Sequence, residues 1–104
     1  MNPHIPIETE VKLRIPSLAA LAPRLQMLGF RLEVPAQAER SVLWDRGIEL
    51  FSQGCALRVR NYAERSWITW KGPKIQDPIL KIRPELETAL ADPVAMEGIL
   101  RALG

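Results

Sequence analysis

The stretch formed by residues 5–15 restricts the fold more than any other part of the chain. Successive side chains of a β-strand point to opposite faces of the sheet. In this stretch charged residues alternate with mostly apolar ones. The charged residues are Glu8, Glu10, Lys12 and Arg14, and the residues between and around them are Ile7, Thr9, Val11, Leu13 and Ile15. The pattern predicts a strand with one charged and one apolar face. Taken alone, it is most simply a strand at the edge of a core with its polar side in water.

Length and composition indicate one globular domain over residues 1–104. The chain has 47% hydrophobic and 25% charged residues, which is usual for folded proteins of this size. Its net charge of +2 indicates a nucleic-acid partner only if the cations gather on one surface. Cys55 is the sole cysteine, which excludes an intrachain disulfide and a thiolate zinc cluster. No signal peptide and no apolar run of membrane-spanning length is present, so we expect a cytoplasmic protein without a membrane partner.

Two helices are predicted. The first covers residues 18–28, with Ser17 as N-cap and Gly29 after its end. Pro23 lies within it, so either the helix is kinked there or it effectively starts near that proline. The second helix starts at Asp92-Pro93, with aspartate as N-cap and proline in the first turn.

Further strands are predicted between the helices. Alternation and β-branched or aromatic residues place them at residues 30–34, 39–45, 56–62, 66–71 and 79–86, with a connection of undefined form at 48–52. Pro84 indicates an edge position or a bulge in the last of them. The order strand, helix, several strands, helix predicts an α+β fold with a mainly antiparallel sheet.

Charge recurs at period two in the later strands. Arg58 and Arg60 share a face, Lys71 shares one with Trp67 and Thr69, and Lys81, Arg83, Glu85 and Glu87 share another. If these strands form one sheet and their apolar sides meet the helices, their charges lie on one face. That face would combine Lys12, Arg14, Arg58, Arg60, Lys71, Lys81 and Arg83 with Glu8, Glu10, Glu85 and Glu87.

Such a mixture has a chemical use. Arginine forks and lysine point charges bind phosphate oxygens, whereas carboxylates beside them repel phosphates unless a divalent cation, Mg²⁺ or Mn²⁺, joins the two. The pattern therefore favours a metal-assisted polyphosphate site. The same alternation also forms ordinary cross-strand ion pairs on a solvated face, and the residues alone leave these two interpretations about equally open.

At these residues the sequence resembles a known family. Glu8-x-Glu10-x-Lys12, Ala-Leu-Arg58-Val-Arg60, Thr-Trp-Lys71-Gly-Pro and Arg83-x-Glu85-x-Glu87 follow in the order seen in the CYTH superfamily. That superfamily, also called the triphosphate tunnel metalloenzymes, contains class IV adenylate cyclases, thiamine triphosphatases and inorganic triphosphatases. The resemblance implies an eight-stranded antiparallel tunnel with the charges inside and helices packed outside.

The resemblance also implies residue roles. Lys12, Arg58, Arg60, Lys71 and Arg83 would bind the triphosphate, and Lys12 and Glu10 would act in catalysis. Glu8 and Glu10 would hold Mg²⁺ or Mn²⁺, with Glu85 and Glu87 as supporting acids. Arg14 and Lys81 share the parity and are weaker candidates, and Trp67 is open to either a packing or a binding role.

Members of that superfamily continue well past the length of this chain, with further strands and a late acidic pair. The chain would therefore be the N-terminal portion of the domain, either as a fragment or as a half-domain that pairs with a second copy to complete the tunnel. The expected function is hydrolysis of an inorganic or organic triphosphate, or cyclisation of ATP to cyclic AMP. A non-catalytic polyphosphate-binding or nucleotide-binding half-domain is the alternative, and an RNA-binding basic sheet a weaker one, because the four acids oppose a phosphate backbone.

Overall fold

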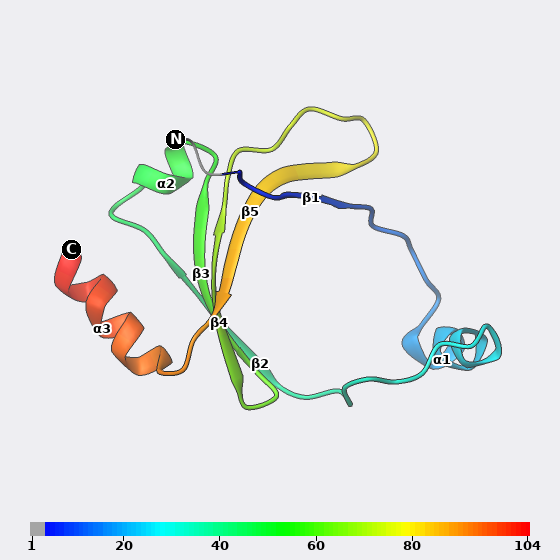
Figure 1. Cartoon of the computed structure of the whole chain (residues 1–104). Coiled ribbons are helices and arrows are strands. Elements are labelled where there is room, and N and C mark those ends of the chain that lie inside the picture. Colours follow the sequence, from blue (N-terminus) through cyan, green and yellow to red (C-terminus); the bar gives the residue numbers. More distant parts are fainter. Residues whose placement is uncertain (1–3) are drawn as a thin grey trace.

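Five antiparallel strands and three helices make up the fold. The computed structural model describes residues 4–104. The strands are β1 (Ile7–Glu10), β2 (Glu39–Trp44), β3 (Ala56–Tyr62), β4 (Arg65–Lys71) and β5 (Lys81–Ala89), and the helices are α1 (Leu18–Met27), α2 (Glu49–Ser52) and α3 (Pro93–Leu103). All strands join one sheet in the order β1-β5-β4-β3-β2. The predicted α+β class with an antiparallel sheet is confirmed, whereas the sheet is open, so closure into a tunnel is not seen in this chain (Figure 1).

Strand β5 links the two parts of the sheet by changing partners at Pro84. Its residues up to Pro84 pair with β1, and its residues from Glu85 onward pair with β4. Proline has no N–H for a ladder bond, and here its carbonyl accepts a hydrogen bond from the backbone N–H of Gly72 at 2.9 Å. The predicted bulge or edge position of Pro84 thus corresponds to this change of partner.

The β3–β4 hairpin turns through Ala63 and Glu64. Both residues have positive φ, 53° and 63°, which is the backbone of a type I′ turn. A side chain in this left-handed region costs about 1 kcal/mol relative to glycine.

We expect Glu64→Gly to raise the free energy of unfolding by about that amount in urea denaturation. The exposed control Arg65→Ala, one residue further along, should change it little; no gain from the glycine would contradict this description of the turn.

Two predicted strand segments do not pair. A strand was predicted over residues 5–15, but its pairing with a neighbour ends at Glu10. Residues 30–34 were also predicted to form a strand and do not. Both segments have the right alternation, but β5 begins at Lys81, opposite Glu10, so no neighbour reaches residues 11–15. No neighbour lies beside residues 30–34 either. A strand requires a partner as well as a pattern.

Helix α3 covers part of the apolar face. Its buried Glu97 lies 3.4 Å from Arg40 of β2, and the Arg101 guanidinium lies 5.3 Å from the centre of the Trp44 ring. Leu100 and Leu103 line an open hollow of about 230 Å³ together with Trp44 and Leu57. Asp92 caps the helix as predicted, because its Oδ1 accepts from Ala95 N–H at 3.0 Å.

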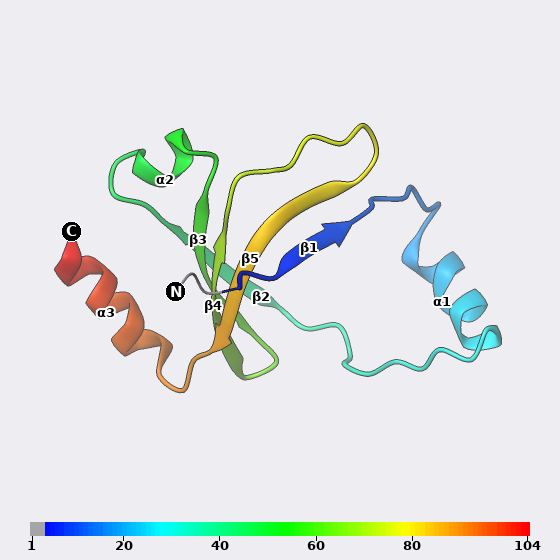
Figure 2. The ribbon, with the colours of Figure 1, turned by 45° about the horizontal axis from the view of Figure 1, so that its top comes forward.

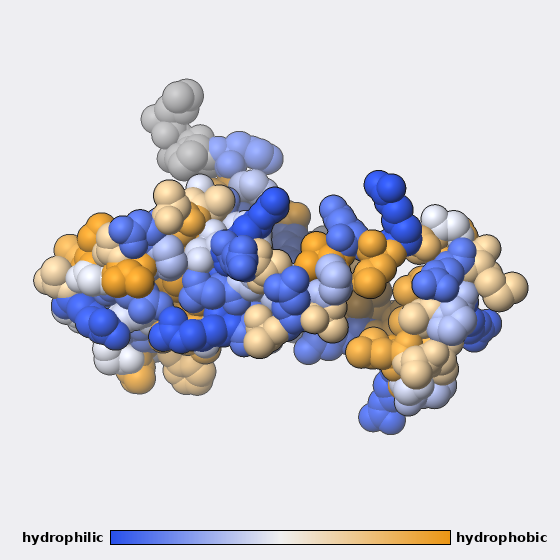
Figure 3. Space-filling view, turned by 90° about the horizontal axis from the view of Figure 1, so that it is seen from below, coloured by the Kyte–Doolittle hydropathy of each residue, from blue (hydrophilic) through white to orange (hydrophobic). Residues whose placement is uncertain are grey.

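Helix α1 stands apart from the sheet. Ser17 caps it and Pro23 lies within it, as predicted, but none of its residues is buried. Figures 1 and 2 show it beyond the end of β1, on the side away from α2 and α3, and Figure 3 shows it as a separate lobe with apolar residues on its surface. The expectation that both helices pack on the apolar face is therefore right for α3 and wrong for α1. Within residues 4–104 no helix has the length and hydrophobicity needed to cross a membrane.

Candidate functional site

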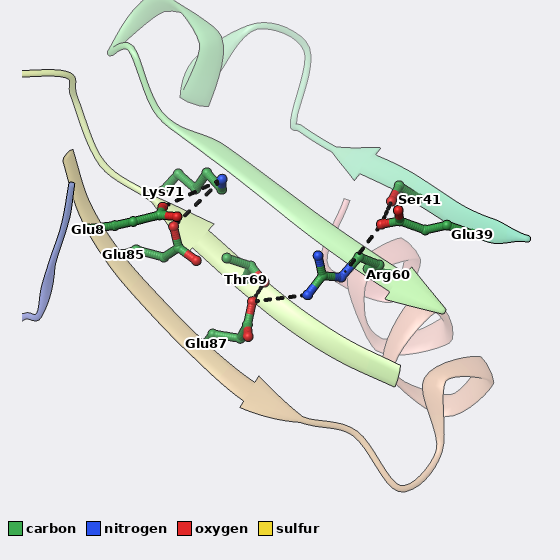
Figure 4. A network of polar contacts seen from close by, with 8 residues as sticks. All are labelled: Glu8, Glu39, Ser41, Arg60, Thr69, Lys71, Glu85 and Glu87. Atoms are coloured by element: carbon green, nitrogen blue, oxygen red, sulfur yellow. Dashed lines mark hydrogen bonds and ion pairs between the residues drawn. The ribbon is translucent and has the colours of Figure 1, made fainter. Parts of the chain in front are cut away.

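The register of the strands places the charged residues on one face. Residues directly opposite in neighbouring strands share a face, and the register pairs Glu8 with Arg83, Lys71 with Glu85, and Arg60 with Trp67. Leu43, Ala56, Tyr62 and Ala89 lie on this side of the sheet as well. We call the following residues of this side the charged face: Glu8, Glu10, Glu39, Ser41, Arg58, Arg60, Trp67, Thr69, Lys71, Lys81, Arg83, Glu85 and Glu87. Helix α3 lies behind the sheet, on the opposite side (Figure 4).

Three strands meet at Lys71. Its Nζ lies 3.6 Å from Oε2 of Glu85 and 3.9 Å from Oε2 of Glu8 (Figure 4). The side chains of Lys71 and Glu85 are less than one-fifth exposed. Both distances exceed those of charge-assisted hydrogen bonds, about 2.7–2.9 Å. The three groups therefore attract one another without forming short charge-assisted hydrogen bonds.

A second group surrounds Arg60. Its Nε lies 3.6 Å from Glu39, its Nη2 lies 3.9 Å from Glu87, and its guanidinium lies 5.2 Å from the centre of the Trp67 ring. Glu87 also accepts a 2.6 Å hydrogen bond from the fully buried Thr69 hydroxyl. Thr69 thus fixes Glu87, while the arginine is held only by longer contacts and by the aromatic ring.

Arg58 lies between these two groups and is half-buried. Within residues 4–104 its side chain makes no hydrogen bond or ion pair, and its Nε is buried without a partner. Three of the buried side-chain atoms that lack a hydrogen bond in the described part of the chain lie on the charged face: Arg58 Nε, Arg60 Nε and Glu85 Oε2. Buried polar groups are nearly always satisfied. Arg60 Nε and Glu85 Oε2 each lie 3.6 Å from an opposite charge, so among these three atoms Arg58 Nε alone has neither a hydrogen bond nor an ion pair within residues 4–104.

The register places Arg83 on the charged face, but its N–H groups donate to backbone carbonyls. Its Nε donates to the Gly72 carbonyl at 2.9 Å and its Nη2 to the Gly54 carbonyl at 3.2 Å, and the residue is 9% exposed. The side chain therefore ties β5 to the end of β4 and to the α2–β3 connection. Its predicted part in triphosphate binding stays a prediction beside these structural contacts.

Lys12 and Arg14 are not brought to the other cations. Both are exposed and lie beyond the last paired residue of β1, and neither makes an ion pair within the described part of the chain. Glu10 is the last residue of β1, opposite Lys81. The expectation that Lys12 belongs to the same ladder as Glu8 and Glu10 is wrong for this chain, because the ladder lacks a partner strand there.

The acids fit a metal only in part. Within residues 4–104 no group of three or more acidic, histidine or cysteine side chains is placed to hold an ion. Glu8 and Glu85, however, converge on one Lys71 amine. Mg²⁺ is usually held by one or two carboxylates together with substrate phosphates. The geometry therefore suits an ion that arrives with a phosphate ligand and does not suit a cage made of protein groups alone.

Glu39 is a residue of the charged face that the sequence reasoning missed. Its carboxylate contacts Arg60 and accepts a hydrogen bond from Ser41 at 3.2 Å. The signal for it was present, since Glu39 and Ser41 alternate with Arg40 and Val42 in a predicted strand. Only the register shows that the Glu39 side belongs to the charged face.

Taken together, Lys71, Arg58 and Arg60 form a row of cations. Arg58 and Arg60 are two residues apart on β3, and Lys71 lies opposite Ala56, two residues before Arg58. Steps of two residues are about 7 Å along a strand. Long arginine and lysine side chains at this spacing can converge on one chain of phosphates.

Comparison with known proteins gives one informative relative. The chain is 32% identical over 101 residues to a protein of Methanocaldococcus jannaschii named "Putative adenylate cyclase MJ0240". The match covers 94% of this chain and 55% of the relative, so the chain spans about half the relative's length. No protein-family model matches the chain. The similarity hints at the family that the motifs indicate and weakly suggests a function connected with nucleotides.

Proposed function

We propose that the chain is the N-terminal portion of a CYTH-type domain and binds a triphosphate on the charged face together with Mg²⁺ or Mn²⁺. The observation that carries the proposal is the half-buried Arg58, whose Nε has no partner within residues 4–104 and which lies between Lys71 and Arg60. Cations normally acquire partners when they are buried. An anion with several charged oxygens is the ligand that satisfies all three side chains at once.

The chemistry that suits this face is transfer of a phosphoryl or nucleotidyl group. Glu8 and Glu85 would help hold a divalent cation, which would supply charge neutralisation at the phosphoryl oxygens. Arg58, Arg60 and Lys71 hold the phosphate chain and stabilise the charge that develops as a phosphoanhydride breaks. Glu10 and Lys12, the catalytic candidates from the sequence, lie at and just beyond the end of β1. Their participation requires residues 11–15 to lie beside this face.

The proposed substrate is a triphosphate, either inorganic or organic. The name of the Methanocaldococcus relative supports a nucleotide, and thereby conversion of ATP to cyclic AMP as one reaction to test. Hydrolysis of a terminal phosphoanhydride needs the same cations and only a water as nucleophile.

One observation favours a second candidate function, binding without turnover. The described residues provide cations in a row but no cluster of three metal-binding acids. A polyphosphate-binding or nucleotide-binding half-domain needs only the cations. The two candidates differ in whether binding is followed by a chemical step.

A phosphate-release and cyclic AMP assay separates them. The chain is incubated with tripolyphosphate, ATP or thiamine triphosphate, with and without Mn²⁺, and each ligand is titrated by calorimetry. On the enzyme proposal, product forms only with metal, and Glu10→Gln lowers the rate at least about 100-fold while triphosphate binding remains measurable. Binding without product supports the second candidate. No binding of any triphosphate, or RNA binding that strengthens in Glu10→Gln and falls steeply with salt, would contradict both.

A further inference from the structure

The unpaired continuation of β1 is the starting observation. Residues 11–15 keep the alternation of a strand but have no neighbour, and Val11, Leu13 and Ile15 are 50%, 80% and 42% exposed. Strand β1 forms one edge of the sheet, so its outer side is open along its whole length. Pro6 and Pro16 bracket the segment, which is where residues without an N–H belong in a ladder.

The segment is self-complementary about Val11. If a second copy lies antiparallel with Val11 opposite Val11, Glu8 faces Arg14 of the second copy and Glu10 faces its Lys12. The two-fold repeats these contacts, so four opposite-charge pairs form on the charged side. On the other side Ile7 faces Ile15 and Thr9 faces Leu13, and the bracketing prolines face each other. Acids in the first half and bases in the second half make this register attractive at every charged position.

The backbone has the polarity that this register requires. The Pro6 carbonyl accepts a hydrogen bond from Glu85 N–H of β5 at 2.9 Å. Backbone groups of alternate residues point to opposite edges of a strand. Even-numbered residues of β1 therefore face β5, and odd-numbered residues present their N–H and C=O at the open edge. In the register centred on Val11 the odd residues face one another as hydrogen-bonded pairs, and the charged pairs occupy the closer non-hydrogen-bonded positions.

A single chain also leaves more surface exposed than a compact monomer of the same length. Its accessible area is 8795 Å², about half as much again as the roughly 5,900 Å² expected for a folded monomer of this mass. Its radius of gyration is 16.9 Å, against about 13 Å for a compact chain of this length. Val59 is the only fully buried apolar side chain in the described residues. The excess is more than the roughly 800 Å² per partner that a standard interface buries.

We propose that two copies of the chain associate through residues 7–15, antiparallel and centred on Val11, to form one continuous ten-stranded sheet. The two charged faces then become one surface. The pairing brings residues 11–15 into a ladder, so that Lys12 and Arg14 of each copy join the charged face of the other. It also places the end of each segment, from which α1 starts, beside the beginning of β1 in the second copy. This association does not depend on which ligand the charged face binds.

Charge exchange tests whether these segments pair between copies. One variant carries Glu8→Lys and Glu10→Lys, and the other carries Lys12→Glu and Arg14→Glu. Each alone turns all four pairs into like-charge pairs, whereas a mixture of the two variants restores four attractive pairs. We expect sedimentation equilibrium to show a dimer for the unaltered chain. We expect each variant alone to dissociate at least about 10-fold more readily and the mixture to form the dimer again.

Three outcomes would overturn the proposal: a monomeric unaltered chain, a dimer that both variants retain, or variants that do not re-form it when mixed. Circular dichroism of the variants shows whether each remains folded.

An independent measurement uses the Cys55→Ser chain with Val11→Cys. The two Val11 Cα atoms would be about 5.5 Å apart, within disulfide range, so mild oxidation should link the copies. Leu13→Cys in the same background is the control and should not link to itself, because its two Cα atoms would be roughly 14 Å apart. Equal linking at both positions would contradict the register.

Discussion

Arg58→Met should reduce affinity for tripolyphosphate by between about 10-fold and 100-fold and leave the free energy of unfolding nearly unchanged. The first expectation follows from the loss of one charge-assisted fork, worth roughly 1.5–3 kcal/mol. The second follows because the Arg58 side chain has no hydrogen bond or ion pair within residues 4–104 that folding would lose. Calorimetric titration measures the affinity, and urea denaturation measures the stability.

Arg24→Met on α1 is the matched control for this prediction. Arg24 is exposed and lies on the helix that stands apart from the sheet, so its loss removes the same charge without touching the charged face. Affinity should stay within about two-fold at about 0.15 M salt, since exposed charges separated by more than the Debye length of about 8 Å are largely screened. Equal losses in the two variants would mean that tripolyphosphate responds to net charge alone and has no site at Arg58.

Arg83→Met, unlike Arg58→Met, should lower the free energy of unfolding, by about 2–4 kcal/mol. The buried guanidinium donates to the carbonyls of Gly72 and Gly54, and methionine would leave both without a partner at a buried corner. Arg83→Lys keeps the charge but can reach one carbonyl at a time, so an intermediate loss is expected. The midpoint of urea denaturation checks both variants. A stable Arg83→Met chain that has lost only triphosphate affinity would show that Arg83 is a ligand-binding residue, as the motif implied.

The faces of the central strands were predictable from sequence. Alternation along residues 56–60 and 81–87 puts arginines and glutamates on one side because the period of a strand is two and apolar residues seek the core. The order of the strands and their register fit this prediction, and they bring Glu8, Lys71 and Glu85 together from three strands. The residues that share a face could therefore be inferred before their neighbours were known.

What alternation cannot show is whether a neighbour exists. Residues 11–15 and 30–34 have strand patterns, yet neither has a partner in the single chain, so the expected place of Lys12 in the ladder was wrong. Arg83 gives a second lesson of this kind. Parity correctly placed it on the charged face, but only the positions of the Gly72 and Gly54 carbonyls show where its donors go. Such contacts depend on connections whose course the sequence pattern does not encode.

The most direct test of the binding site is to follow the arginine Nε–H signals by NMR while tripolyphosphate is added. Our account predicts that the signals of Arg58 and Arg60 shift together and saturate at one equivalent per charged face, while that of Arg24 stays in place. Shifts confined to arginines outside the sheet, or no saturable shift at Arg58, would contradict the claim that this face binds a triphosphate.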